Sequence, residues 1–335
     1  MKILVIRFRQ MGDAILATPL LSTLRANFPD AQIDFVLNER IAPLFEGHPA
    51  ISHIITFSDE ERHSVLTYIR KVWRTVHLTR YDAIIDMRST VNTMLFALFS
   101  LRSRWRVGIR KPYTWGVFNH RFEGCEDDES MIDHNLKLAH PLLMEGAKED
   151  RNLSLAITEK EQHDFRQYME RQGIDFSRPV MLVGVTAKLA HKTWAEDRMT
   201  EVLCRFIAAC PHWQLIFNYA PGQEAENAHR IFSNMADKAS VSSVFLNIEA
   251  KSPRQLAAMA ANCTAYFGNE GGARHIVHAM GRPSLVICSP GASKTTWLPQ
   301  DTDILAIGID APSYDLITVD KVWPELQRFC EAILK

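Results

Sequence analysis

A carboxylate near the start of the chain stands where a catalytic base could act. Residues 7–13 read RFRQMGD and follow a short apolar run, so Asp13 falls where a strand would pass into a helix. A carboxylate at the mouth of a binding site can accept a proton from a hydroxyl group, which makes Asp13 a candidate general base. Asp is also a preferred N-cap residue of helices, and the residue type alone leaves both interpretations open. No G-x-x-x-x-G-K-[ST] or G-x-G-x-x-G pattern follows the run, which argues against P-loop chemistry and an ordinary NAD enzyme.

Three segments of the second half have residues that suit a phosphate-bearing ligand. The first, VTAKLAHKTWAED at residues 185–197, includes Thr186, Lys188, Lys192 and Trp194. A lysine in such a loop can meet a phosphate group as a point charge. A solvated lysine is the simpler alternative, and Trp194 could merely pack at the start of a helix.

The other two segments begin predicted helices. Glu224 could accept hydrogen bonds from ribose hydroxyls, or merely complement the helix dipole. In GNEGGARH, residues 268–275, Glu270, Gly271 and Gly272 are predicted to bind the same ligand, and the N–H groups at this helix start are expected to bind its diphosphate. His275 is expected to pack or to contact phosphate, because no third metal ligand lies nearby. The sequence therefore predicts neither a metal site nor a cofactor.

The order of apolar and amphipathic segments predicts an α/β fold. In the first half, β-branched runs at 2–8, 32–37, 51–57 and 81–87 alternate with amphipathic stretches at 13–28, 61–78 and 91–101. The second half repeats the pattern, with strands predicted at 179–186, 213–219, 244–248, 265–268 and 284–288. Such βαβ repetition indicates a mostly parallel sheet with helices on both faces, and ligands bind beyond the carboxyl ends of its strands. We expect two Rossmann-like domains, residues 1–155 and 156–318, and a closing helix at 319–335.

Charge is distributed unevenly along the chain. The formal net charge is -1, so the whole molecule has no electrostatic attraction to nucleic acid, and no nucleic-acid partner is expected. Residues 62–121 hold twelve Lys and Arg against two Asp, a local charge of +10, with the dense cluster RSRWRVGIRK at 102–111. Scattered charges usually form a solvated face, but this density favours an anionic binding partner, such as a phosphorylated lipid-linked saccharide at a membrane surface. The residues predicted to bind this partner, which would be the acceptor in a transfer reaction, are Arg9, Arg104, Arg106, Arg110 and Lys111.

The sequence predicts a cytoplasmic protein. Its first apolar run, residues 3–6, is shorter than the core of a signal peptide, and the apolar segment 94–101 is too short to span a bilayer. The six cysteines form no C-x-x-C pair, which fits reduced thiols. Contact with the inner face of the cytoplasmic membrane is expected to be peripheral.

Taken in order, these motifs resemble those of the ADP-heptose:lipopolysaccharide heptosyltransferases, glycosyltransferase family 9. IRFRQMGDAILATPLL, from residue 6 on, has the G-D pair and the T-P pair of that family. The family's K-x-W-P motif appears as Lys192-Thr193-Trp194, with Ala195 in place of proline. GNEGGARHIVHAMGRP, residues 268–283, is similar to the late family motif, with Glu270 where Asp is usual and Gly271 where Ser or Thr is usual.

The resemblance implies a fold, a reaction and residue roles. The fold would be GT-B, two facing Rossmann-like domains with a cleft between them, and the reaction an inverting sugar transfer without a metal. Asp13 would be the catalytic base, Lys192 the phosphate-binding lysine, Glu224 the ribose-binding acid, and Gly271 with Gly272 the diphosphate site. The implied donor is a nucleotide sugar, ADP-heptose, and the implied acceptor is a lipopolysaccharide core or a similar anionic saccharide.

Two other functions are compatible with these motifs. A sugar-nucleotide 2-epimerase shares the GT-B fold and needs no separate acceptor. A degenerate, nucleotide-binding transferase-like protein would bind without catalysis, although the presence of both Asp13 and Lys192 argues against it.

Overall fold

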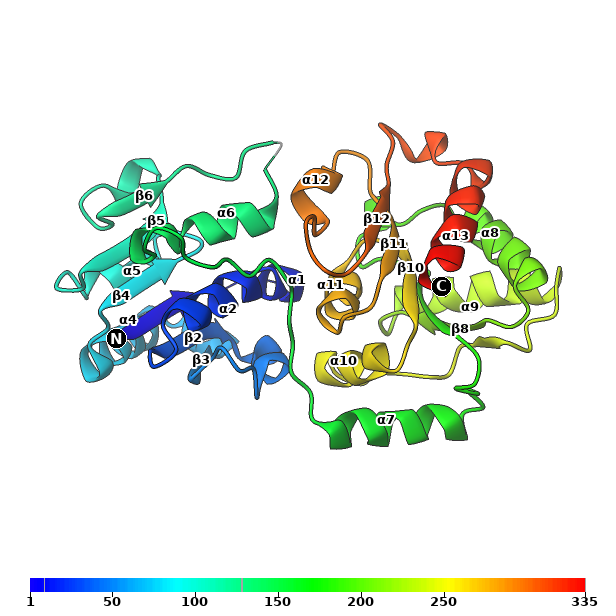
Figure 1. Ribbon diagram of the computed structural model, residues 1–335, viewed down its shortest axis with the longest axis horizontal. Helices are drawn as coiled ribbons and strands as arrows, with labels where there is room; N and C mark the ends of the chain where they lie inside the picture. The colour runs from blue at the N-terminus through cyan, green and yellow to red at the C-terminus, as the bar shows by residue number, and fades with distance from the viewer. Residues whose placement is uncertain (9, 128, 335) are drawn as a thin grey trace. The chain divides into compact units, whose positions relative to one another are not determined.

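The computed structural model describes residues 1–8, 10–127 and 129–334, and the chain forms two compact units, Met1–Ala156 and Ile157–Lys335 (Figure 1). Each unit has one six-stranded sheet in which every strand is parallel to its neighbours. The α/β class predicted from the sequence is confirmed. No helix among the described residues is long and apolar enough to cross a bilayer.

The first sheet has the strand order β3-β2-β1-β4-β5-β6. Its strands are β1 (Lys2–Ile6), β2 (Gln32–Asn38), β3 (His53–Phe57), β4 (Ala83–Asp86), β5 (Trp105–Ile109) and β6 (His120–Phe122). The apolar residues of β1 and β4 are completely buried, as expected for strands covered on both faces. The α-helices of this unit are α1 (Met11–Ile15), α2 (Thr18–Asn27), α3 (Asp59–His63), α4 (Val65–Thr79), α5 (Met94–Leu98) and α6 (Met131–Lys137).

The stretch predicted as one helix over 13–28 is divided into α1 and α2. Pro19 lies in the first turn of α2, where its missing N–H group removes no helical hydrogen bond. The hydroxyl of Thr18 donates to the carbonyl oxygen of Ile15 at 2.7 Å, which satisfies a group at the end of α1. The break leaves α1 as a separate short helix that carries Asp13.

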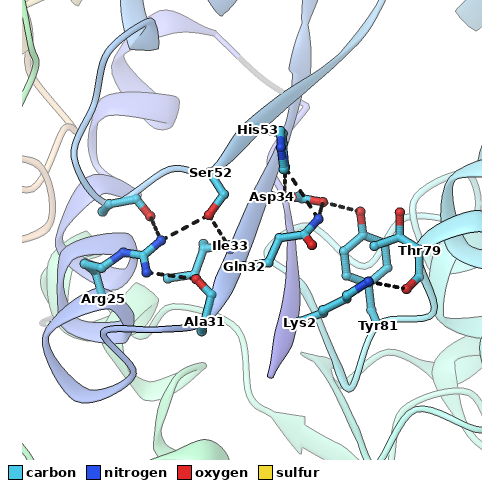
Figure 2. Close-up of polar contacts among 11 residues, drawn as sticks. Lys2, Arg25, Ala31, Gln32, Ile33, Asp34, Ser52, His53, Thr79 and Tyr81 are labelled. Atoms are coloured by element: carbon cyan, nitrogen blue, oxygen red, sulfur yellow. Dashed lines mark hydrogen bonds and ion pairs between the residues drawn. The ribbon is translucent and has the colours of Figure 1, made fainter.

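The amino edge of the first sheet is held together by a buried carboxylate (Figure 2). Asp34 accepts hydrogen bonds from the Tyr81 hydroxyl at 2.6 Å and from Gln32 Nε2 at 2.8 Å, and His53 Nδ1 lies 2.9 Å from its other oxygen. Burial, reinforced by the bond to Asp34, raises the pKa of Tyr81, so its hydroxyl stays protonated and donates. The network therefore joins β2, β3 and the segment that leads into β4.

The second sheet has the order β12-β11-β10-β7-β8-β9. Its strands are β7 (Val180–Gly184), β8 (Gln214–Asn218), β9 (Val244–Phe245), β10 (Ala265–Asn269), β11 (Ser284–Ile287) and β12 (Ala306–Ile309). The α-helices are α7 (Glu159–Arg171), α8 (Glu196–Ala209), α9 (Gln223–Ala236), α10 (Pro253–Ala261), α11 (Gly272–Ala279), α12 (Lys294–Trp297) and α13 (Val319–Ile333). The last helix, α13, lies against α8 and buries Val322, Leu326 and Phe329 in the core of this unit.

The two sheets have the same topology. When the strands of each unit are counted from its own first strand, both sheets have the order 3-2-1-4-5-6, which is that of the Rossmann fold. The order reverses between β1 and β4 in the first unit and between β7 and β10 in the second. Ligands of such sheets bind at this switch point, beyond the carboxyl ends of the strands.

Candidate functional site

Asp13 lies at the switch point of the first unit, in the short helix that follows β1. Its side chain is 11% exposed, and Arg7 Nη2 donates to Asp13 Oδ1 at 3.2 Å. Gln10 occupies the N-cap of α1, while Asp13 is the third residue of the helix. The N-cap alternative for Asp13 is therefore wrong, and its carboxylate is held by a guanidinium instead.

Arg7 is a residue of this site that sequence reasoning did not select. It is 2% exposed, and its Nη1 donates to the carbonyl oxygen of Met87, just beyond β4, at 2.9 Å. Its Nε donates to the carbonyl oxygen of Asp13 at 3.3 Å. One guanidinium thus connects the ends of the two central strands to the helix that carries Asp13. In the sequence, the only sign of this role is the position of Arg7, one residue after an apolar strand and six before Asp13.

The end of β4 adds a second buried carboxylate. Asp86 accepts hydrogen bonds from the backbone N–H groups of Arg88 at 3.0 Å and Ser89 at 2.8 Å. Burial raises the pKa of Asp86, while these bonds and nearby Lys111 oppose that shift. Lys111 Nζ donates to the carbonyl oxygen of Arg88 at 2.9 Å, so the lysine lies at the same edge of the sheet.

The predicted acceptor-binding cluster is divided between the two ends of β5. Arg110 and Lys111 follow β5 at the carboxyl edge, where Arg110 pairs with Glu123 at 3.0 Å. Arg104 precedes the strand and stacks on the ring of Trp105 at 4.3 Å. Arg106 is the second residue of β5 and donates to three backbone carbonyl oxygens, those of Leu101, Ser103 and Val117. The structure therefore brings together Arg110 and Lys111 but not Arg104 and Arg106, and Arg9 lies outside the described residues.

Lys192 lies at the switch point of the second unit. It ends a short 3-10 helix, Ala190–Lys192, in the loop after β7, and its Nζ is 2.6 Å from Glu270 Oε1, just beyond β10. The hydroxyl of Ser289 donates to the same carboxylate oxygen at 2.8 Å. Three loops that are distant in sequence therefore meet at Glu270.

The start of α11 is beside this ion pair. Gly271 is the N-cap in extended conformation, and no side chain caps the helix. Gly268 has φ +135°, and a Cβ there would collide with the backbone of Gly184 in the neighbouring strand. Glycine at 268 therefore allows β10 and β7 to approach closely where the loops of the switch point begin.

Glu224 lies in the first turn of α9 and connects two loops. Its Oε2 accepts a hydrogen bond from the Thr186 hydroxyl at 3.1 Å and one from the backbone N–H of Ala220 at 3.4 Å. The structure thus brings Glu224 and Thr186 together at the carboxyl edge of β7 and β8. Lys188 is exposed in the loop between Thr186 and Lys192.

The direct donor contact predicted for Trp194 is not supported by its packing. The side chain is 0% exposed, lies in the core, and donates from Nε1 to the carbonyl oxygen of Ile317 at 2.9 Å. Its backbone N–H donates to Asn269 Oδ1 at 2.7 Å, which fixes the loop against β10. Trp194 therefore packs in the core before α8 and holds the loop against β10, in agreement with the interpretation of Trp194 as a packing residue.

His275 lies in α11, nine-tenths buried beside Arg274, whose Nη2 is 3.0 Å from His275 Nε2. Burial, and then the positive charges of Arg274 and Lys192, hold the pKa of His275 well below its usual value. Its imidazole is therefore neutral at pH 7, and any contact with phosphate would be a neutral hydrogen bond.

One group in the described residues has ligands of the kind that bind metals. Donor atoms of Cys125, Glu129 and His134, in and before α6, lie within 4.8 Å of one another. Glu129 Oε1 already pairs with Lys137 Nζ at 2.5 Å, and Glu129 Oε2 lies 3.5 Å from His134 Nδ1. The carboxylate is thus partly neutralised by Lys137, while burial lowers the pKa of His134 and favours its uncharged form.

A hollow of about 720 Å³ lies on the first unit at the amino edge of its sheet. Its lining includes Gln32, Asp34, His53, Arg70 and Arg74. It is at the opposite edge of the sheet from Asp13, and none of the predicted site residues lines it.

The sequence of the chain matches the profile of glycosyltransferase family 9 (heptosyltransferase) over residues 69–308. The chain belongs to this family. It is therefore a glycosyltransferase by family, and the resemblance inferred from its motifs is confirmed.

Curated relatives and solved structures agree with this assignment. Lipopolysaccharide heptosyltransferase 3 of Escherichia coli is 23% identical over 204 residues, which are 58% of this chain and 57% of the relative, so the match spans little more than half of that protein. Lipopolysaccharide heptosyltransferase 2 of E. coli is 23% identical over 313 residues, 88% of this chain and 85% of the relative.

Among solved structures, a family 9 glycosyltransferase from Veillonella parvula has a TM-score of 0.83 at 16% identity, covering 98% of this chain and 96% of that one. E. coli heptosyltransferase WaaC with ADP has a TM-score of 0.73 at 16% identity, covering 98% and 100%. These likenesses confirm the GT-B class of fold.

Proposed function

We propose that this family 9 protein is an inverting, metal-independent glycosyltransferase. It would move a heptose or a related sugar from a nucleoside-diphosphate donor, ADP-heptose, to an anionic saccharide acceptor such as a lipopolysaccharide core. The solved relative with ADP supports ADP as the nucleotide, and the curated relatives support a lipopolysaccharide acceptor.

The observation that carries the proposal is the arrangement around Lys192. An ammonium group lies beside the uncapped start of an eight-residue helix, at the switch point of a Rossmann unit. A cation and free helix N–H groups together favour a diphosphate. In the same unit, Glu224 and Thr186 could accept and donate hydrogen bonds to a ribose, and Lys188 and His275 complete the proposed donor set.

The chemistry follows from these groups. The acceptor oxygen attacks the anomeric carbon while the bond from that carbon to the diphosphate oxygen breaks, and the electron pair leaves with the nucleoside diphosphate. Asp13 takes the proton of the acceptor hydroxyl, and Arg7 positions its carboxylate. Lys192 and the start of α11 stabilise the negative charge that grows on the leaving diphosphate.

An anionic acceptor would meet the positive segment 62–121, and Arg110 with Lys111 are at the same edge of the sheet as Asp13. The acceptor roles of Arg9, Arg104 and Arg106 stay predictions. Because the acceptor is proposed to be lipid-linked, we also propose that the protein acts in the cytoplasm with peripheral contact at the membrane surface.

Calorimetric titration with ADP, UDP and GDP tests the donor site. We expect selective ADP binding that Lys192→Ala weakens, because the substitution removes the point charge beside α11. Lys238→Ala, an exposed lysine elsewhere in the same unit, is the matched control and should leave the affinity unchanged.

Two results would contradict the proposal. Preference for UDP or GDP would move the donor to another sugar class, and failure of the folded protein to bind any of the three would remove the donor-site assignment. A new sugar nucleotide formed from donor alone, without acceptor, would instead indicate an epimerase.

A further inference from the structure

Helix α4 of the first unit buries only one of its faces. Tyr68, Val72 and Val76 pack into the core beneath it, with Phe8 and Phe57. These positions recur at the spacing of an amphipathic helix, so the core accounts for this side of α4. The opposite side of the helix is open.

A strip of apolar side chains runs along one edge of that open side, about a quarter-turn around the helix from the buried residues. Leu66 is 83% exposed, Ile69 37% and Trp73 49%, and at three to four residues apart they share one side of the helix. We refer to Leu66, Ile69 and Trp73 as the apolar strip. Helix α5, which contacts α4, ends at Leu98, which is 37% exposed, and Leu101 in the turn after it is 56% exposed. Single exposed apolar residues are ordinary, but a contiguous group of large ones indicates a contact surface.

The apolar strip is bordered by arginines. Arg70 and Arg74 lie further around the exposed side of α4, where they also line the hollow of the first unit; both are exposed, and neither has an ion-pair partner within the part of the chain that is described. Arg102 follows Leu101. The surrounding segment, 62–121, carries twelve basic side chains against two acidic ones, so the surface is strongly positive.

We propose that α4 docks the protein on the surface of an anionic lipid bilayer, with the apolar strip in the headgroup region and Arg70 and Arg74 on lipid phosphates. Trp and Leu beside arginine are the composition of helices that lie in the membrane interface. A second copy of this chain is not the expected partner of this surface, because its own +10 segment would be repelled by the first. The inference rests on the proposed function in one respect, since a lipid-linked acceptor requires the enzyme at a membrane.

The arginines give a measurable expectation. Each basic residue near an anionic surface strengthens binding about fivefold. Arg70→Gln with Arg74→Gln should therefore weaken vesicle binding about 30-fold. Leu66→Ser with Trp73→Ser should weaken it about tenfold or more, because two large apolar side chains no longer leave water.

The test is co-sedimentation of the full chain with vesicles of phosphatidylcholine alone and of phosphatidylcholine mixed with phosphatidylglycerol. We expect binding to the mixed vesicles, weaker binding to neutral ones, and loss of binding at high salt. Met144→Ser with Lys148→Gln is the matched control, since it removes an exposed apolar residue and an exposed cation from another part of the same unit and should bind as the unmodified protein does. Because all these positions are exposed, thermal melting should show every variant folded.

Three results would overturn the inference. The unmodified protein could fail to bind mixed vesicles, or neither α4 double variant could weaken vesicle binding. The third is self-association in analytical ultracentrifugation that these variants abolish. ADP calorimetry on the same variants separates this inference from the donor site. Variants that lose vesicle binding should retain ADP affinity, and a protein that binds ADP but no vesicles would refute the docking surface alone.

Discussion

The ion pair between Lys192 and Glu270 leads to a prediction about affinity for the nucleotide. In the structure the ammonium group that should receive the diphosphate is already 2.6 Å from a carboxylate. A bound diphosphate must compete for Lys192 and tolerate the negative charge of Glu270. Glu270→Gln removes that charge and nearly preserves the shape, so we expect tighter binding of ADP.

The size of the effect follows from the burial of the pair. Lys192 is 39% and Glu270 14% exposed. Exposed pairs contribute about 0.2–1 kcal/mol, and breaking fully buried ones costs about 3–5 kcal/mol. This half-buried pair should oppose ADP by about 1–2 kcal/mol, which corresponds to an affinity gain of about 5- to 30-fold.

Calorimetry on a double-mutant cycle checks this reasoning. If Glu270 acts through Lys192, Glu270→Gln should tighten ADP binding in the natural sequence and have much less effect in the Lys192→Ala background. Glu331→Gln, on the exposed face of α13, serves as the charge-matched control. Weaker ADP binding by Glu270→Gln would refute the competition and show that the carboxylate itself holds the nucleotide.

Three further predictions concern the base, the core and pH. Asp13→Asn should lower kcat by about 10²–10⁴-fold while ADP affinity in calorimetry stays unchanged, because the amide cannot take the acceptor proton; retained turnover would remove Asp13 as the base. Trp194→Phe should cost about 1–3 kcal/mol in urea unfolding, because the smaller ring leaves a cavity in the core and the carbonyl of Ile317 keeps only its bond from Arg198, and it should change ADP affinity little; a large loss of affinity without loss of stability would restore Trp194 as a donor contact. Burial lowers the pKa of His278 to about 3, so below its unfolded value of 6.5 the unfolded chain takes up the proton first. Stability should therefore be complete above about pH 6.5 and fall as the pH decreases towards 3, and His278→Gln should flatten that part of a urea-midpoint profile; an unchanged slope would contradict the assignment.

The sequence predicted the parts of the fold that depend on local patterns. Continuous apolar runs identified β1, β4, β7 and β10, the four strands that flank the two switch points, and their order placed Asp13 and Lys192 at carboxyl ends. It missed β5, β6 and β12. In β5 and β6, WRVGI and HRF, basic residues interrupt the apolar pattern, and both strands lie towards one side of the sheet. An edge strand such as β6 does not need the continuous apolar run of a central one, and β5 lies beside it.

Side-chain partners were beyond such reasoning. Lys192 and Glu270 are 78 residues apart, and Arg7 meets Met87 across 80 residues, so neither contact leaves a periodic signal. The division of the basic cluster shows the same limit. RSRWRVGIRK looks like one group in sequence, yet Arg104 precedes β5 and Arg106 lies near its start, whereas Arg110 and Lys111 follow its end. The carbonyl oxygens that Arg106 contacts belong to the loops around β5.

Two departures from the family pattern affect the proposed diphosphate site in opposite ways. Where Ser or Thr is usual, Gly271 is the N-cap of α11, and without a side-chain oxygen the helix start keeps an N–H group that a capping hydroxyl would have taken. This leaves one more donor for a diphosphate. Where Asp is usual, Glu270 is longer by one methylene and reaches both Lys192 and Ser289. The glycine therefore strengthens the attraction of the helix start for an anion, while the glutamate covers the neighbouring cation until an anion competes for it.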